Sequence, residues 1–130
     1  MKIGFDYWNV CSAHPEHFAQ LAGMYLRNYR GAFGKMHDEI HIVSAIGKSR
    51  LGTVKAEVDK LEIPYTAVHE IVFRHPRESP ELKTAFCLDN GITVFYDDRQ
   101  DVVDAMTEAG ILAFRVPRMD STTDIGAERV

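Results

Sequence analysis

The sequence contains few cysteines: only Cys11 and Cys87 occur among its 130 residues. Two thiols do not make the disulfide framework that holds small secreted domains together. A chain of this length can bury a hydrophobic core of its own within one domain, so it needs no such crosslinks. We therefore expect two reduced thiols in a cytoplasmic protein.

Long hydrophobic runs are also missing. After Met1 and Lys2 the first apolar run ends at Asp6, so the N-terminus lacks the hydrophobic segment of a secretory signal. No stretch approaches the roughly 20 apolar residues that cross a bilayer as a helix. These absences predict a soluble protein that has no membrane partner.

Positive charge is not in excess. The chain carries 15 Lys and Arg residues against 19 Asp and Glu residues, which gives a formal net charge of −4. A general nucleic-acid coat protein needs a broad basic surface, because contacts to phosphates dominate its affinity. The composition argues against that class, while 45% hydrophobic and 26% charged residues are ordinary for a globular domain.

Short β-type runs alternate with helical segments along the chain. The expected strands cover residues 2–6, 39–44, 65–68 with 71–73, 92–96 and 111–116. The expected helices cover residues 15–29, 49–61, 81–90 and 98–109, with Ser49 as the cap of the second and residues 74–80 as a loop. This alternation predicts an α/β domain with a three-layer Rossmann-like fold, in which helices cover both faces of a five-stranded parallel sheet.

Polar side chains stand where the expected strands end. Asp6 ends the first strand, Ser44 ends the second, and Asp97 and Asp98 follow the fourth. Ligands of such sheets bind beyond the carboxyl ends of the strands. Three carboxylates there suit Mg²⁺, and a carboxylate can also attack phosphorus. Lys83 stands in the helix before the fourth strand, where its amine offsets the accumulated negative charge.

These residues resemble, in this order, the motifs of the haloacid dehalogenase-like (HAD) superfamily, most of whose members are phosphohydrolases. The resemblance covers about residues 2–116. Its strongest part is ITVFYDDRQDVVDAMTEAGILAFRV, which looks most like the 3′-phosphatase domain of phage polynucleotide kinase-phosphatases. The run IHIVSAIGKSR is similar to the second motif, and ELKTA supplies the lysine of the third.

The resemblance implies a Mg²⁺-dependent phosphomonoesterase. In that family's chemistry Asp6 would be the nucleophile, Ser44 would bind a phosphoryl oxygen and Lys83 would stabilise the charged centre. The metal ligands would be Asp6, Asp97 and Asp98, together with a backbone carbonyl two residues after the nucleophile.

One position departs from the family pattern. The family's phosphatases place a second carboxylate two residues after the nucleophile, where it protonates the leaving group, and this sequence has Trp8 there. An indole N–H is not an acid near neutral pH, and general acid–base catalysis is typically worth about 10²–10⁴ in rate. Three interpretations stay open: a phosphohydrolase, a catalytically impaired binding module of the same fold, and a structural protein that keeps only the fold.

The sequence leaves no room for the large cap domains of the family, because only a helix and a short strand fit between Ser44 and Lys83. We therefore expect an open site. Open sites in this family accept large phosphorylated substrates, such as nucleotides or nucleic-acid ends, or are covered by another subunit of a homo-oligomer. The residues expected to contact the substrate are Trp8, Lys48 and Arg99.

The domain organisation is expected to be simple. Residues 1–116 form the HAD-like Rossmannoid domain, and no second domain or internal repeat is visible. Residues 117–130 lack apolar periodicity and are expected to form a flexible C-terminal tail.

Overall fold

The computed structural model describes residues 1–27 and 38–118. In this part of the chain, five parallel strands form one sheet in the order β3-β2-β1-β4-β5. The strands are β1 (Lys2–Phe5), β2 (Glu39–Gly47), β3 (Ala67–Phe73), β4 (Ile92–Asp97) and β5 (Leu112–Arg115). The predicted α/β class and five-stranded parallel sheet are confirmed.

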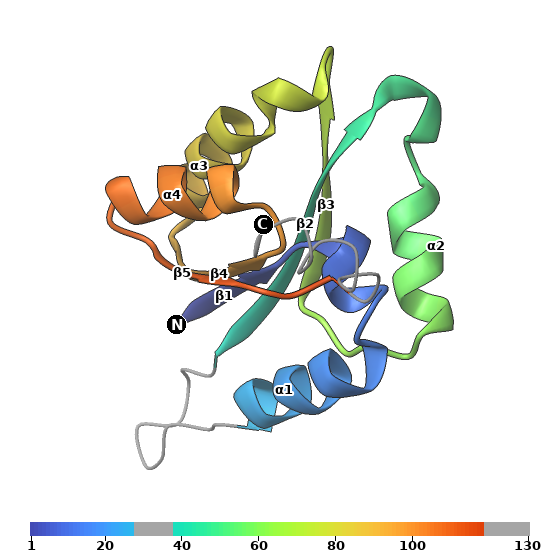
Figure 1. Cartoon of the computed structure of the whole chain (residues 1–130). Coiled ribbons are helices and arrows are strands. Elements are labelled where there is room, and N and C mark those ends of the chain that lie inside the picture. Colours follow the sequence, from blue (N-terminus) through green and yellow to red (C-terminus); the bar gives the residue numbers. More distant parts are fainter. Residues whose placement is uncertain (28–37, 119–130) are drawn as a thin grey trace, which may run out of the picture.

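Helices cover both faces of this sheet, as the sequence predicted. They are α1 (Pro15–Arg27), α2 (Thr53–Lys60), α3 (Ser79–Asn90) and α4 (Gln100–Glu108). Figure 1 shows α1 and α2 on one face and α3 and α4 on the other. Short helical turns also occur: η1 (Tyr7–Cys11) follows β1, η3 (Lys48–Arg50) follows β2, and η4 (Pro76–Glu78) leads into α3.

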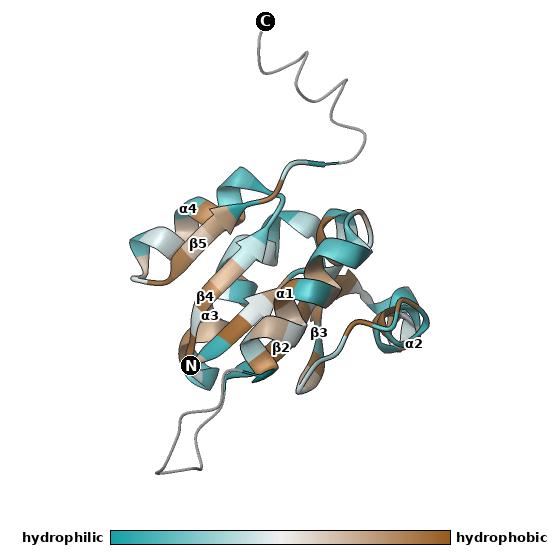
Figure 2. Cartoon of the chain, turned by 90° about the horizontal axis from the view of Figure 1, so that it is seen from below, coloured by the Kyte–Doolittle hydropathy of each residue, from teal (hydrophilic) through white to brown (hydrophobic). Residues whose placement is uncertain are grey.

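Each face of the sheet has its own hydrophobic cluster. The cluster beneath α1 and α2 includes Ile3, Phe5, Phe18, Val54 and Val58. The cluster beneath α3 and α4 includes Val43, Cys87, Phe95, Val102 and Met106. Strands carry much of the hydrophobic colour in Figure 2, whereas α2 is mainly hydrophilic. Both cysteines are buried as free thiols, which agrees with the expected reduced state.

The strand β2 is longer than the sequence predicted. We expected it to end at Ser44, but it continues to Gly47 because its second half pairs with β3. The pairing between β1 and β2 ends at the residue pair Phe5 and Ile42, so β2 extends past the carboxyl end of β1. Ser44 therefore lies within a strand, and the register places it one residue beyond the level of Asp6.

The helix expected over residues 49–61 begins later, and the prediction that Ser49 caps it is wrong. The residue before α2 is Gly52, whose φ of 92° is in the left-handed region that favours glycine. The carboxylate of Glu70, on β3, accepts hydrogen bonds of 2.9–3.1 Å from the N–H groups of Gly52 and Val54. A cap supplied by a neighbouring strand leaves no signal in the local sequence.

Other boundaries shift by a few residues. β3 is one strand, not the two short runs expected at residues 65–68 and 71–73. The segment expected as a loop over residues 74–80 contains the turn η4 and the start of α3. The predicted stop at Gly91 is confirmed, since its φ of 71° is left-handed and its N–H bonds the last carbonyls of α3.

The expected C-terminal tail lies mostly outside the described residues. Its first two residues are described, and they contact the domain. The carbonyl oxygen of Pro117 is 2.8 Å from Nε2 of His14, and Arg118 reaches the side chain of Asp98. In the described ranges, no helix has the length and apolar character needed to cross a membrane.

Two histidines that contact each other, His41 on β2 and His69 on β3, predict that the stability of the fold depends on pH. Nδ1 of His41 lies 2.9 Å from Nε2 of His69, and the two rings stack with an interplanar angle of 9°. Burial, and then the nearby His41, lowers the pKa of His69 below its usual value. The unfolded chain therefore takes up this proton more readily, so stability should fall as the pH drops below about 6.5.

Urea unfolding between about pH 5 and pH 8 measures this dependence. In the variant His69→Phe the free energy of unfolding should fall less at acid pH than in the unmodified protein. The matched control His17→Gln, at an exposed position of α1, should keep it. An unchanged pH profile in His69→Phe would show that the histidine pair is not its source.

Candidate active site

Three carboxylates meet where β1 and β4 end. Asp6 follows the last residue of β1, Asp97 is the last residue of β4, and Asp98 comes next. An oxygen of each lies within 4.8 Å of the others, and all three side chains are buried. The structure thus brings together the three acids that the strand ends indicate.

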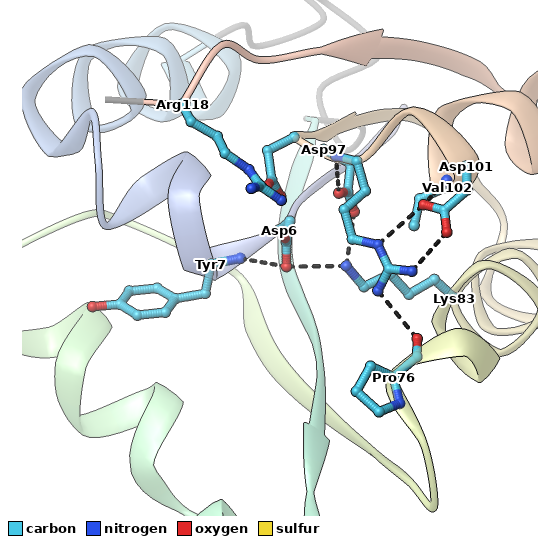
Figure 3. A network of polar contacts seen from close by, with 10 residues as sticks. Asp6, Tyr7, Pro76, Lys83, Asp97, Asp101, Val102 and Arg118 are labelled. Atoms are coloured by element: carbon cyan, nitrogen blue, oxygen red, sulfur yellow. Dashed lines mark hydrogen bonds and ion pairs between the residues drawn. The ribbon is translucent and has the colours of Figure 1, made fainter. Parts of the chain in front are cut away.

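Lys83 is the buried cation of this cluster. It lies in the second turn of α3, and its Nζ is 2.7 Å from Oδ2 of Asp97 and 3.1 Å from Oδ1 of Asp6. Figure 3 shows its amine reaching between the two carboxylates. The same oxygen of Asp6 accepts a 2.9 Å hydrogen bond from the N–H of Tyr7. In the described part of the chain, Oδ2 of Asp6 accepts no hydrogen bond, which leaves it available for a ligand.

The cluster holds more negative charge than it can neutralise. Burial, and then the nearby Asp97, raises the pKa of Asp6 well above its usual value, and Lys83 only partly opposes this. Burial likewise raises the pKa of Asp97, again against the opposing effect of Lys83. A divalent cation would offset the excess negative charge.

The donor set fits Mg²⁺. This ion prefers hard oxygen ligands, is bound through a small number of carboxylates, and keeps several waters. Asp6, Asp97 and Asp98 offer such oxygens at a spacing that one ion can bridge. Among the described residues this is the one group of three or more acidic, histidine or cysteine side chains close enough to hold a metal.

Ser44 presents a second feature that a ligand would satisfy. Its side chain is fully buried, and its Oγ has no hydrogen-bond partner. A buried hydroxyl without a partner is costly, and native structures usually satisfy such groups. The register places Ser44 just past the end of β1, but its side chain does not line the cavity beside Asp6, so its contact with a phosphoryl oxygen stays a prediction.

A cavity of about 200 Å³ opens onto Asp6, Asp98 and Lys83, whereas the fully buried Ser44 and Asp97 are not in its wall. Its walls are formed by Asp6, Trp8, Asn9, Ala45, Phe73, Pro76, Ser79, Lys83, Asp98, Arg99 and Arg118. Two of the three residues expected to contact a substrate, Trp8 and Arg99, are therefore in its wall. The third, Lys48, is exposed in η3 and does not line the cavity, so its contact with a substrate stays a prediction.

Trp8 lies two residues after Asp6 and lines the cavity. Its ring packs edge-on against Tyr7, and the guanidinium of Arg50 lies 4.8 Å from the ring centre. The chain turns sharply after it, at Asn9, whose φ of 62° is left-handed. The indole Nε1 is buried with no hydrogen-bond partner. Trp8 therefore contributes an aromatic wall to the cavity and no transferable proton.

Arg99 is fixed at the cavity wall by three hydrogen bonds. Nε and Nη2 bond the two carboxylate oxygens of Asp101 at 3.0 and 2.6 Å, and Nη1 bonds the carbonyl of Pro76 at 3.1 Å. A guanidinium has five N–H donors, so two stay available for an anion. Asp101, an exposed residue in the first turn of α4, holds this arginine in place.

Sequence reasoning missed Arg118. Its Nε donates a 2.8 Å hydrogen bond to Oδ2 of Asp98, and Figure 3 shows its side chain extending into the site. Arg118 comes from a segment without periodicity, and no local pattern indicates that this segment returns to the carboxylates. The contact depends on β5 ending beside β4, which only the fold reveals.

Arg118 should compete with a metal ion for Asp98. Partly exposed ion pairs contribute about 0.2–1 kcal/mol, so Arg118→Gln should bind Mg²⁺ up to about fivefold more tightly. Calorimetric titration with Mg²⁺ measures the change. The control Arg77→Gln removes an equal charge at an exposed position outside the cavity and should leave the affinity unchanged. Weaker binding by Arg118→Gln would contradict the competition.

Comparisons with known proteins show the fold. No family profile matches the chain, and no curated protein matches it significantly. Two solved structures of the Pnkp1/Rnl/Hen1 complex, one described as an RNA repair complex, contain a similar chain. The TM-scores are 0.66 and 0.65 at 15% identity; the matches cover 88% of this chain but only 45% and 42% of those chains. This chain therefore spans less than half the length of its structural neighbours.

Proposed function

We propose that the protein is a Mg²⁺-dependent phosphohydrolase that removes a terminal phosphoryl group through Asp6. The observation that carries this proposal is the buried cluster at the end of β1. There one carboxylate has an oxygen available for attack, Lys83 holds its other oxygen, and two further carboxylates lie close enough to share a cation. This combination matches the chemistry that the HAD-like motifs imply.

The chain's own residues supply the first step. Oδ2 of Asp6 attacks the phosphorus, an O–P bond forms, and the bond to the leaving oxygen breaks with its electron pair. Lys83 keeps Asp6 oriented, while the Ser44 hydroxyl and the available N–H groups of Arg99 hold phosphoryl oxygens. A bound Mg²⁺ would neutralise developing charge on the phosphoryl group. Water then attacks the phosphorus of the acyl phosphate and regenerates Asp6.

The open cavity supports a large substrate. Among the described residues no second domain covers the carboxyl ends of the strands, since β1 and α1 are joined only by residues 6–14. Arg99 and Arg118 line the approach, and guanidinium groups suit phosphates. The structural neighbours come from an RNA repair complex, so we propose that the substrate is a phosphorylated nucleotide or nucleic-acid end.

Trp8 supports a second candidate function, a module that binds a metal ion and a phosphorylated partner without turnover. Its indole replaces the acid that speeds both steps in phosphatases of this kind. Such a module would bind Mg²⁺ through Asp98 and its neighbours yet release no phosphate from any donor.

Hydrolysis of an activated aryl phosphate separates the two candidates. With p-nitrophenyl phosphate and Mg²⁺ the protein should release nitrophenol, because this leaving group needs no proton. Chelation of the metal should stop the release, and added Mg²⁺ should restore it. Mg²⁺ binding without any release would support the binding module instead.

A further inference from the structure

Among the described residues, the cavity wall offers no side chain suited to protonate a leaving oxygen. Its titratable wall residues are Asp6, Lys83, Asp98, Arg99 and Arg118. The nucleophile cannot serve, and guanidinium groups do not release protons near neutral pH. The ammonium of Lys83 is held between Asp6 and Asp97 at 3.1 and 2.7 Å, so it serves these two carboxylates and not a leaving oxygen. Asp98 is engaged in an ion pair with Arg118, whose Nε lies 2.8 Å from Oδ2 of Asp98.

No described histidine lines the cavity either. Trp8 stands two residues after Asp6, where the HAD-like motif has its acid, and its neighbour Asn9 is an amide. Its other wall residues are Ala45, Phe73, Pro76 and Ser79, none of which donates a proton at neutral pH. Because none of these wall residues supplies a proton, we expect a leaving oxygen to depart as an anion.

The cavity is instead suited to stabilise an anion. Arg99 is fixed at the wall with two N–H groups available, and Arg118 is also in the wall. Fixed charges aimed at the place where negative charge develops stabilise that charge without a proton transfer. The leaving group best matched to this wall is itself a phosphate, which is a stable anion and binds guanidinium groups.

Resting on the proposed function, we propose that the phosphoryl donor is a phosphoanhydride: the terminal phosphate of a nucleoside triphosphate or of a 5′-polyphosphorylated nucleic-acid end. Oδ2 of Asp6 forms a bond to the terminal phosphorus, and the anhydride P–O bond breaks. The electron pair stays on the departing phosphate oxygen, beside Arg99 and Arg118. Water later cleaves the acyl phosphate to Asp6 and inorganic phosphate, with the proton passing to solvent.

The ring of Trp8 adds a contact that fits a nucleotide. It lines the cavity and is backed by the guanidinium of Arg50 at 4.8 Å. Stacking of a base on an aromatic side chain is worth about 1–3 kcal/mol and tolerates any base. Trp8, which stands in place of the acid, thus provides a surface on which the base of the nucleotide donor can stack.

The test compares donors that differ in their leaving group. Release of phosphate is measured with a nucleoside triphosphate, a 5′-triphosphorylated oligonucleotide, a 3′-phosphorylated oligonucleotide and p-nitrophenyl phosphate. The unmodified protein should show a kcat/KM for one of the two anhydrides at least about 10²-fold above that for the 3′-phosphate ester, the rate that a missing acid costs. A higher rate on the free nucleotide or on the oligonucleotide identifies the source of the anhydride.

Variants at Trp8 test the reason for this preference. Trp8→Asp should raise the rate on the 3′-phosphate ester about 10²-fold more than the rate on the anhydrides. Trp8→Phe, which keeps an aromatic ring and adds no acid, should not. If Trp8→Asp fails to fold, the comparison of donors in the unmodified protein still tests whether the anhydride is preferred.

The outcomes separate this inference from the proposed function. Equal kcat/KM values on the 3′-phosphate ester and the anhydrides would overturn the anhydride proposal and leave the phosphohydrolase standing. Hydrolysis of p-nitrophenyl phosphate without hydrolysis of either anhydride would do the same. If the protein releases phosphate from none of the four donors, both the anhydride proposal and the phosphohydrolase proposal are overturned.

Discussion

The variant Asp6→Asn is expected to lose phosphate release almost completely, with kcat lowered by at least about 10⁴-fold. An amide has no anionic oxygen with which to attack phosphorus, so the covalent step cannot start. The fold should survive, because the amide still accepts the hydrogen bond from Tyr7 and relieves part of the repulsion with Asp97. Steady-state assays with p-nitrophenyl phosphate and Mg²⁺ measure the loss.

A matched control makes this result specific. Asp104 is an exposed aspartate of α4 that, among the described residues, accepts a hydrogen bond from Gln100 alone, so Asp104→Asn should keep full activity. Circular dichroism and thermal unfolding of Asp6→Asn should show a folded protein. If the folded variant Asp6→Asn hydrolyses the donor at the unmodified rate, another residue is the nucleophile.

Of the proposed variants, Lys83→Met should have the largest effect on stability. We expect it to lower the free energy of unfolding by about 3–5 kcal/mol. Lys83 is 3% exposed and is the cation that pairs both Asp6 and Asp97. Methionine has a similar length but no charge, so its neighbours become buried carboxylates without a counter-ion. Urea unfolding without metal measures the loss.

Mg²⁺ should restore part of this stability, because an ion bound to the native state stabilises it by mass action and takes over the role of the lysine. The double variant Lys83→Met/Asp97→Asn should also recover part of the loss. The control Lys55→Met breaks an exposed i,i+4 pair with Asp59 and should cost no more than about 0.5 kcal/mol. A loss in Lys83→Met as small as that in Lys55→Met would contradict the account of the buried cluster.

The positions of the acids could be predicted from the sequence because the signals are local. Hydrophobic runs end at Asp6 and before Asp97, and a parallel sheet aligns the carboxyl ends of its strands. Lys83 could be placed for a similar reason, since its helix leads directly into β4. These inferences need only the order of the elements, which the alternation of strands and helices provides.

What the sequence could not provide depends on contacts between distant segments. Ser44 was expected at a strand end, but pairing with β3 prolongs β2 past it. Glu70 caps α2 from another strand, and Arg118 reaches Asp98 from the far end of the chain. Lys48 was expected at the site because it follows Ser44 closely, yet the longer strand carries it past the cavity.

Trp8 illustrates a limit of a different kind. The motif comparison shows that the acid is missing, but it does not show what takes its place in space. The structure adds that the guanidinium of Arg50 lies against the ring, that Asp101 holds Arg99, and that none of the described wall residues supplies a proton. The inference about the donor follows from these contacts and not from the motif.

The central claim is that Asp6 becomes phosphorylated, and one measurement tests it most directly. The unmodified protein is incubated with Mg²⁺ and the best phosphoryl donor, quenched in acid, and its peptides are analysed by mass spectrometry. We predict an added phosphoryl group on the peptide that contains Asp6, which accumulates because the site lacks a base to speed its hydrolysis, and which is absent in Asp6→Asn. Phosphate release during turnover with the label on another residue, or with an equal label in Asp6→Asn, would contradict the account.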